Sequence, residues 1–171
     1  MKLIKIAFAL FALLATTASA QMLIEVPTIE KDANGLSVPM DFAIDLKGVS
    51  DKGLEFSQFK DKPLVVFFFS AKCPHCIRAY PHVELMQKEF AEMGMTFLAI
   101  ASGSNQTRDV KKFIDDQQAS LPFFIDSDRA FAGKYKITSV PTTFLVNSKG
   151  EFIRYNNFSK EKIDLEIAIK D

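Results

Sequence analysis

The chain has 171 residues, of which 21 are basic and 21 acidic, so its formal net charge at pH 7 is zero. This balance gives no sign of a surface made for nucleic acid or for an anionic membrane, and we expect no nucleic-acid partner. Hydrophobic residues make up 48% of the chain, which suffices for one compact domain with its own core.

Residues 1–20 have the pattern of a secretory signal peptide. Lys2 and Lys5 precede an apolar run at residues 6–15, and small residues at 18–20 form a cleavage site. The apolar run is shorter than the roughly 20 residues that a membrane span needs. We therefore expect cleavage and a periplasmic mature chain, which keeps 19 basic and 21 acidic residues after Lys2 and Lys5 are lost. An uncleaved anchor in the inner membrane, facing the periplasm, is the alternative.

A lead-in at residues 21–35 and one domain at 36–171 follow the signal. Residues 40–48 alternate apolar and polar side chains, which predicts a strand or hairpin arm, and residues 54–62 suit a short helical turn. Residues 63–69, with the sequence PLVVFFF, form a continuous apolar run. Such a run is typical of a central strand that is buried on both faces.

The next segments alternate between helix and strand. Residues 74–93 have a helical pattern, and residues 95–102 read as a second buried strand. Residues 104–118 predict a polar surface helix. Three residues at its start could cap it: Ser104, Asn105 and Thr107.

The last third of the chain predicts a short strand at 121–126 and a helical turn at 127–137. Two strands at 142–147 and 151–156 are joined by a hairpin turn, and a helix at 159–171 closes the chain. The early alternation implies parallel strands, and the hairpin adds antiparallel ones. We therefore predict an α/β fold: a mixed sheet with helices on both faces.

The chain has two cysteines, Cys73 and Cys76, placed between the predicted central strand and the helix at 74–93. A bridge across so short a loop restrains the unfolded chain little, which favours redox chemistry or metal binding over a structural staple. A helix N-terminus carries free N–H groups and a partial positive charge, so it stabilises a thiolate at Cys73. Cys76 lies one turn further in, as a resolving thiol would.

Two neighbouring side chains could favour the Cys73 thiolate further. His75, between the cysteines, is a potential cation or donor, and Lys72 directly precedes the motif. Both would stabilise the reduced pair and make the disulfide a stronger oxidant. Against this, His75 could be an exposed helix residue without a role, and Lys72 a solvated side chain.

The segments at 67–81 and 138–152 resemble the thioredoxin superfamily, most closely its TlpA/ResA-like extracytoplasmic branch, and the resemblance extends over roughly residues 37–156. It implies a thioredoxin-like fold with an N-terminal extension and a helix–strand insertion at 104–125. It also implies a proline kink in the active-site helix at Pro81. A substrate-docking segment with a cis proline, lying against the sulfurs, would consist of Val140, Pro141 and Thr142.

The Cys-Pro-His-Cys motif is the tetrapeptide of DsbA-type oxidants, whereas three other positions depart from related proteins. Phe67 stands where thioredoxin has a buried aspartate, and Lys72 where a tryptophan is usual. Ala79 replaces a glutamate of several TlpA-like reductases. A buried acid helps to deprotonate the resolving thiol, so its absence leaves the direction of exchange open.

Together these features predict an enzyme, a periplasmic thiol–disulfide oxidoreductase with a redox-active Cys73–Cys76 disulfide. It would act either as an oxidase or isomerase, or as a reductase, for example in cytochrome c maturation. The expected catalytic residues are Cys73, Cys76, His75 and Pro141. We expect no cofactor and no metal. The expected partners are substrate proteins with thiols or disulfides and a redox partner protein, for which a membrane protein is one candidate.

Two other classes of function compete. A copper-binding, metallochaperone-like module could use the two thiols with His75 or His82 as soft ligands, although a closed zinc site lacks four well-spaced ligands. A thiol peroxidase would need the signature Pro-x-x-x-Thr-x-x-Cys. Val66 and Ser70 occupy its proline and threonine places.

Overall fold

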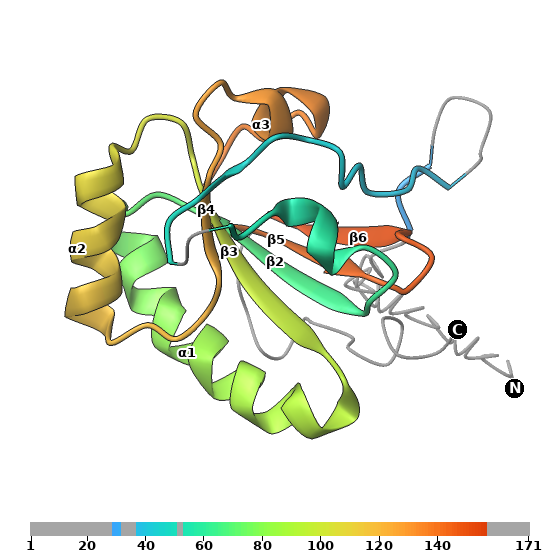
Figure 1. Ribbon diagram of the computed structural model, residues 1–171, viewed down its shortest axis with the longest axis horizontal. Helices are drawn as coiled ribbons and strands as arrows, with labels where there is room; N and C mark the ends of the chain where they lie inside the picture. Colours follow the sequence, from blue (N-terminus) through green and yellow to red (C-terminus); the bar gives the residue numbers. More distant parts are fainter. Residues whose placement is uncertain (1–28, 32–36, 51–52, 157–171) are drawn as a thin grey trace, which may run out of the picture.

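The computed structural model describes residues 29–31, 37–50 and 53–156 (Figure 1). The predicted signal peptide, most of the predicted lead-in and the predicted C-terminal helix at 159–171 lie outside these residues. Among the described residues, no helix combines the length and the apolar character that crossing a bilayer requires.

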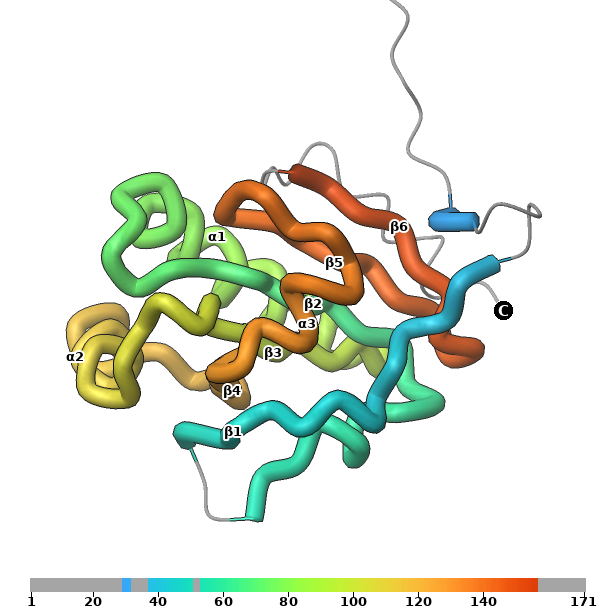
Figure 2. Tube along the Cα trace, turned by 90° about the horizontal axis from the view of Figure 1, so that it is seen from above, coloured from blue at the N-terminus to red at the C-terminus, as the bar shows by residue number. Residues whose placement is uncertain are grey.

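The described part of the chain forms a mixed sheet with strand order β1-β4-β3-β2-β5-β6. Figure 2 shows this order, from β1 at one edge to β6 at the other. β2 pairs in parallel with β3, and β3 with β4, whereas the β5–β6 hairpin adds antiparallel strands on the other side of β2. The strands are β1 (Lys47–Gly48), β2 (Leu64–Phe69), β3 (Thr96–Ala101), β4 (Phe123–Ile125), β5 (Thr142–Val146) and β6 (Phe152–Tyr155).

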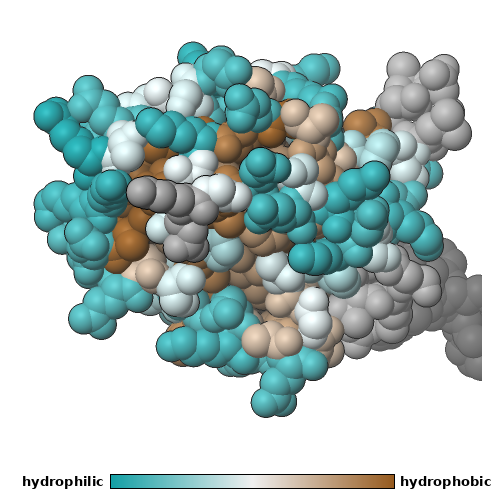
Figure 3. Space-filling view, in the orientation of Figure 1, coloured by the Kyte–Doolittle hydropathy of each residue, from teal (hydrophilic) through white to brown (hydrophobic). Residues whose placement is uncertain are grey.

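Helices cover both faces of this sheet, as predicted. Side chains of α1 (Pro74–Phe90) and α2 (Thr107–Gln117) pack on one face. Those of the short 3₁₀ helix η1 (Phe56–Phe59) and of α3 (Ala130–Lys134) pack on the other. A second 3₁₀ turn, η2 (Ala91–Met93), ends α1. Figure 1 shows α1 and α3 on opposite sides of the strands, and Figure 3 shows hydrophilic side chains around the rim of the same view.

β2 is the centre of both cores, because all six of its residues are buried. Its side chains alternate: Val65, Phe67 and Phe69 face α1, whereas Leu64, Val66 and Phe68 face α3. Phe67 lies 6.2 Å from Tyr80 of α1 between ring centroids, and Phe68 lies 5.9 Å from Phe131 of α3. Aromatic side chains of this size bury large apolar areas, so the strand that leads into the cysteine motif is held firmly.

Two local predictions were wrong. The strand expected at 40–48 is a strand only at Lys47–Gly48, because the Asp41 carboxylate accepts the N–H of Ala43 at 3.0 Å and turns the chain before it. The helix expected from 104 begins at Thr107, and its N-cap is Gln106. The Asp109 carboxylate accepts the Gln106 N–H at 3.0 Å, which fixes that start.

Candidate active site

The cysteine motif follows β2 after a short turn. The Cys73 N–H donates to the Ser70 carbonyl at 3.0 Å, and the Cys73 carbonyl accepts the N–H of Ile77 at 3.0 Å. Cys73 is therefore the N-cap of α1, and Pro74 occupies the first turn, where its missing N–H costs nothing. Cys73 is half-buried and Cys76 fully buried, and both are free thiols. The structure thus places the two sulfurs where the sequence predicts them.

The environment of Cys73 favours its thiolate. Burial raises the pKa of Cys73, but hydrogen bonds from the backbone N–H and thiol of Cys76 and from the backbone N–H of His75 outweigh it, together with the charge of Arg78. The net result is a pKa below the ordinary range of a cysteine. The helix N-terminus thereby stabilises an anion, as such positions do.

The environment of Cys76 has the opposite effect. Burial, and then the neighbouring Cys73 sulfur, raise the pKa of Cys76 to about 12, although the Ser70 backbone opposes this shift. The two sulfurs therefore differ: the thiolate form is favoured at Cys73, while Cys76 stays protonated and shielded at neutral pH.

The predicted docking segment lies against the sulfur of Cys73. The Val140–Pro141 peptide bond is cis, as the resemblance implies. The carbonyl oxygen of Val140 lies 3.9 Å from Cys73 Sγ, within range of a weak S–H···O contact. Pro141 and Thr142 are buried, and the Thr142 hydroxyl donates to the Ser139 carbonyl at 2.8 Å. The start of β5 and the start of α1 therefore form one site.

The cation that lowers the pKa of Cys73 is Arg78, whereas the sequence suggested His75 or Lys72. His75 Nδ1 lies 3.0 Å from a guanidinium nitrogen of Arg78. A guanidinium only donates, so His75 is the acceptor and its side chain does not act as the cation. The Lys72 ammonium instead pairs with Asp109 at 2.9 Å. The charge that lowers the Cys73 pKa comes from Arg78. The three-residue helical spacing from His75 to Arg78 is the signal in the sequence that could have identified it.

Sequence reasoning also missed the role of Asn105, which is only 6% exposed. Its Oδ1 accepts the Ala71 N–H at 3.0 Å and the Ser70 hydroxyl at 3.3 Å. Its Nδ2 donates to the carbonyl and the hydroxyl oxygen of Ser102, at 2.8 and 3.0 Å. Asn105 therefore ties the turn before Cys73 to the end of β3. The signal in the sequence is a polar residue in the turn after a buried strand, at a position that also suits helix capping.

The positions where related proteins carry an acid hold none here. Phe67 is fully buried on the face that α1 covers, and Ala79 lies on α1 itself. Thr143 of β5 is the cross-strand neighbour of Phe67. Its buried hydroxyl has no hydrogen-bond partner in the described part of the chain. Pro81 lies inside α1, as predicted.

The residues 29–31, 37–50 and 53–156 contain no group of three or more His, Cys, Asp or Glu side chains that could hold a metal ion. Two histidines were candidate metal ligands. Nδ1 of His75 is hydrogen-bonded to Arg78, and His82 is an exposed residue of α1. The copper-binding alternative is therefore not favoured.

Comparisons with known proteins agree with this geometry. The sequence matches the AhpC/TSA family over residues 35–155. The thiol-disulfide oxidoreductase ResA of Halalkalibacterium halodurans is 31% identical over 109 residues, which cover 64% of this chain and 61% of the relative. The chain spans about three-fifths of the length of the curated relatives that it matches first.

Solved structures show the same fold. A thiol:disulfide interchange protein of the thioredoxin family from Chlorobium tepidum TLS has a TM-score of 0.62 and 27% identity, covering 78% of this chain and 98% of that one. A thiol-disulfide isomerase from Corynebacterium glutamicum has a TM-score of 0.67 and 18% identity, covering 78% and 97%. The implied thioredoxin-like fold is confirmed. Because the family match covers most of its length, the chain belongs to the AhpC/TSA family.

Proposed function

We propose that the protein is a thiol–disulfide oxidoreductase that exchanges disulfides with partner proteins through Cys73 and Cys76. One observation carries the proposal. At the start of α1 the pKa of Cys73 is lowered and the pKa of Cys76 is raised. The names of relatives such as ResA support the same activity. Val66 and Ser70 do not fit a thiol peroxidase signature, so we do not propose peroxide reduction.

The exchange takes two steps. When the reduced protein meets a substrate disulfide, the Cys73 thiolate attacks one sulfur, a mixed disulfide forms, and the other substrate sulfur leaves as a thiolate with the electron pair. Cys76 then loses its proton and attacks Cys73 Sγ, which releases the second substrate thiolate and leaves the Cys73–Cys76 disulfide. Two electrons pass to the substrate. Run backwards, the same steps oxidise a substrate dithiol.

We propose that the oxidising direction is favoured. A thiolate exists only in the reduced pair, so the interactions that lower the Cys73 pKa stabilise that state and make the disulfide easier to reduce. Phe67 stands where thioredoxin has a buried aspartate, and Ala79 where several TlpA-like reductases have a glutamate, so the acid that helps to deprotonate a resolving thiol is replaced at both positions. The reductase direction, as in cytochrome c maturation, is the alternative that a measured potential distinguishes.

The test is the equilibrium of the Cys73–Cys76 pair in glutathione buffers. We expect a potential less negative than about −200 mV, closer to disulfide isomerases than to thioredoxin at about −270 mV. A potential near the thioredoxin value would contradict the oxidising direction. A Cys76→Ser variant should accumulate mixed disulfides with proteins through Cys73. If mass spectrometry finds none, the exchange function itself fails.

We also propose that exchange takes place in the periplasm after removal of residues 1–20, with a redox partner that renews the pair. N-terminal sequencing of the protein recovered from the periplasm of an expression host should then begin at Gln21. An intact N-terminus in a membrane fraction would favour the anchored alternative.

A further inference from the structure

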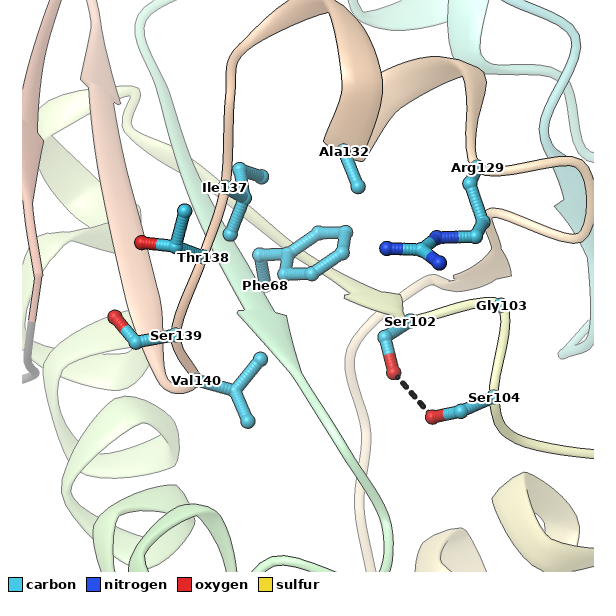
Figure 4. A pocket seen from close by; sticks show the side chains of 10 residues that line it. All are labelled: Phe68, Ser102, Gly103, Ser104, Arg129, Ala132, Ile137, Thr138, Ser139 and Val140. Atoms are coloured by element: carbon cyan, nitrogen blue, oxygen red, sulfur yellow. Dashed lines mark hydrogen bonds between the residues drawn. The ribbon is translucent and has the colours of Figure 1, made fainter.

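A cavity of about 400 Å³ opens beside the docking segment. Three segments that are distant in sequence line it: the turn after β3, the start of α3, and residues 137–140 before β5. Phe68 of β2 forms its floor and is only 2% exposed. Figure 4 shows these side chains around the opening, with the Phe68 ring between Ile137 and Arg129.

One residue, Val140, connects this cavity to the sulfur of Cys73. Val140 lines the cavity, and the carbonyl oxygen of Val140 lies 3.9 Å from Cys73 Sγ. A chain segment that places a sulfur on Cys73 and passes Val140 therefore enters the cavity with its neighbouring residues.

Arg129 is the single charged residue of the lining. Its guanidinium points into the cavity toward Phe68 (Figure 4) and makes no ion pair or side-chain hydrogen bond with the described residues. The nearby acid, Asp126, is fully buried, and its two carboxylate oxygens accept the N–H groups of Phe131 and Ala132, each at 2.9 Å. The positive charge of Arg129 is therefore available to a ligand.

The position of Arg129 is built into the backbone. Its φ is 62°, in the left-handed region, and its N–H donates to the Asp126 carbonyl at 3.1 Å. At Gly103, across the cavity rim, an added Cβ would lie 2.4 Å from the Asp126 carbonyl oxygen and 3.0 Å from Arg129 Cγ. Only glycine allows this close approach, so the side-chain stem of Arg129 packs directly over Gly103. On the same rim the hydroxyls of Ser102 and Ser104 lie 2.9 Å apart, so one donates to the other and one hydroxyl proton is left for a ligand.

We propose that this cavity binds the substrate segment beside the reacting cysteine and selects an acidic side chain in it. The carboxylate of an aspartate or glutamate would pair with Arg129, whose planar guanidinium suits bidentate binding of a carboxylate. The apolar stem of that side chain would rest on Phe68 and Ile137. A basic side chain would meet the unpaired charge and be rejected. This proposal rests on the proposed function and names its substrate class.

The experiment uses the reduced protein and peptides with one cysteine blocked as a mixed disulfide with uncharged mercaptoethanol. Glutamate is placed at each of four positions on either side of the cysteine, with matched glutamine and lysine peptides. At one position or more we expect the glutamate peptide to react roughly five times faster than its glutamine counterpart, a difference that falls with added salt. Arg129→Gln should abolish this preference, and Arg129→Glu should shift it to lysine.

Lys111→Gln is the matched control, because it removes an exposed charge of α2 outside the cavity and should leave the preference unchanged. Oxidised wild-type protein and Arg129→Gln should react equally fast with dithiothreitol, which has no carboxylate. Equal rates for glutamate and glutamine peptides at every position, or a preference that survives Arg129→Gln, would overturn the cavity proposal and leave the exchange function standing. Failure to exchange with any peptide or with dithiothreitol would overturn both.

Discussion

The guanidinium of Arg78 donates to Nδ1 of His75 at 3.0 Å, so the two side chains form one unit on the exposed surface of α1. The positive charge of this unit is on Arg78, and it helps to lower the pKa of Cys73. His75 contributes to the same shift through its backbone N–H. The residue between the cysteines therefore acts at the sulfur by its main chain, and a residue two positions after the motif supplies the charge.

Replacing Arg78 by glutamine should raise the pKa of Cys73 and destabilise the reduced pair. Because exposed charge interactions are each worth less than about 1 kcal/mol, the potential should become more negative by only about 5–20 mV. Titration of the thiolate absorbance and the glutathione equilibrium measure both effects. Lys111→Gln, which removes an exposed cation of α2, is the control. A potential that moves equally in both variants would exclude a local role for Arg78.

A pair of variants at His75 separates side chain from backbone. His75→Ala removes the imidazole and keeps the N–H, whereas His75→Pro removes both, at a first-turn position of α1 that tolerates proline. We expect His75→Pro to raise the Cys73 pKa and to make the potential more negative by roughly 30 mV, the value of one hydrogen bond to a charged group. His75→Ala should shift it by less than half as much. Equal shifts would assign the effect to the imidazole.

The pH dependence of alkylation should differ between the two sulfurs. Reaction with iodoacetamide requires the thiolate, so its rate rises as pH passes through the pKa of the attacked thiol. In Cys76→Ser, Cys73 should react at pH values where an ordinary thiol is protonated, because its pKa is lowered. In Cys73→Ser, Cys76 should stay slow at these pH values, because its burial, which still raises its pKa, is unchanged. Overlapping profiles would refute the assignment of attacking and resolving thiols.

The sequence predicted the elements whose signals are local. The apolar run that became β2 and the helical pattern of α1 were sufficient to place Cys73 at a helix start. The contacts that adjust the site join side chains from separate segments. Lys72 meets Asp109 of α2 through a bridge that no periodicity encodes, because apolar patterns report which face is buried and not which polar group lies opposite. The short β1 has a similar cause, since one hydrogen bond from the Ala43 N–H to the Asp41 carboxylate overrides the strand pattern.

Asn105 is the clearest residue of this kind, and it yields the last prediction. Its buried amide joins Ala71 and Ser70, in the turn before Cys73, to Ser102 at the end of β3. Replacing it by alanine leaves the partly buried N–H of Ala71 without its acceptor, which should lower the free energy of unfolding by about 1–3 kcal/mol.

If Asn105 has a purely structural role, its replacement lowers only the free energy of unfolding. If it positions the cysteines, the replacement also changes the redox potential of the pair. The Ser70 backbone bears on the pKa of Cys76, and the Ser70 carbonyl holds the Cys73 N–H. A loosened turn should therefore alter the potential of the pair as well as its stability. Asn105→Asp keeps the acceptor for Ala71 and loses the donors to Ser102, so it should retain more of the wild-type potential than Asn105→Ala does. Both variants should be compared at a temperature where each is fully folded. If the two potentials equal that of the wild type while stability falls, Asn105 supports the fold and does not position the cysteines.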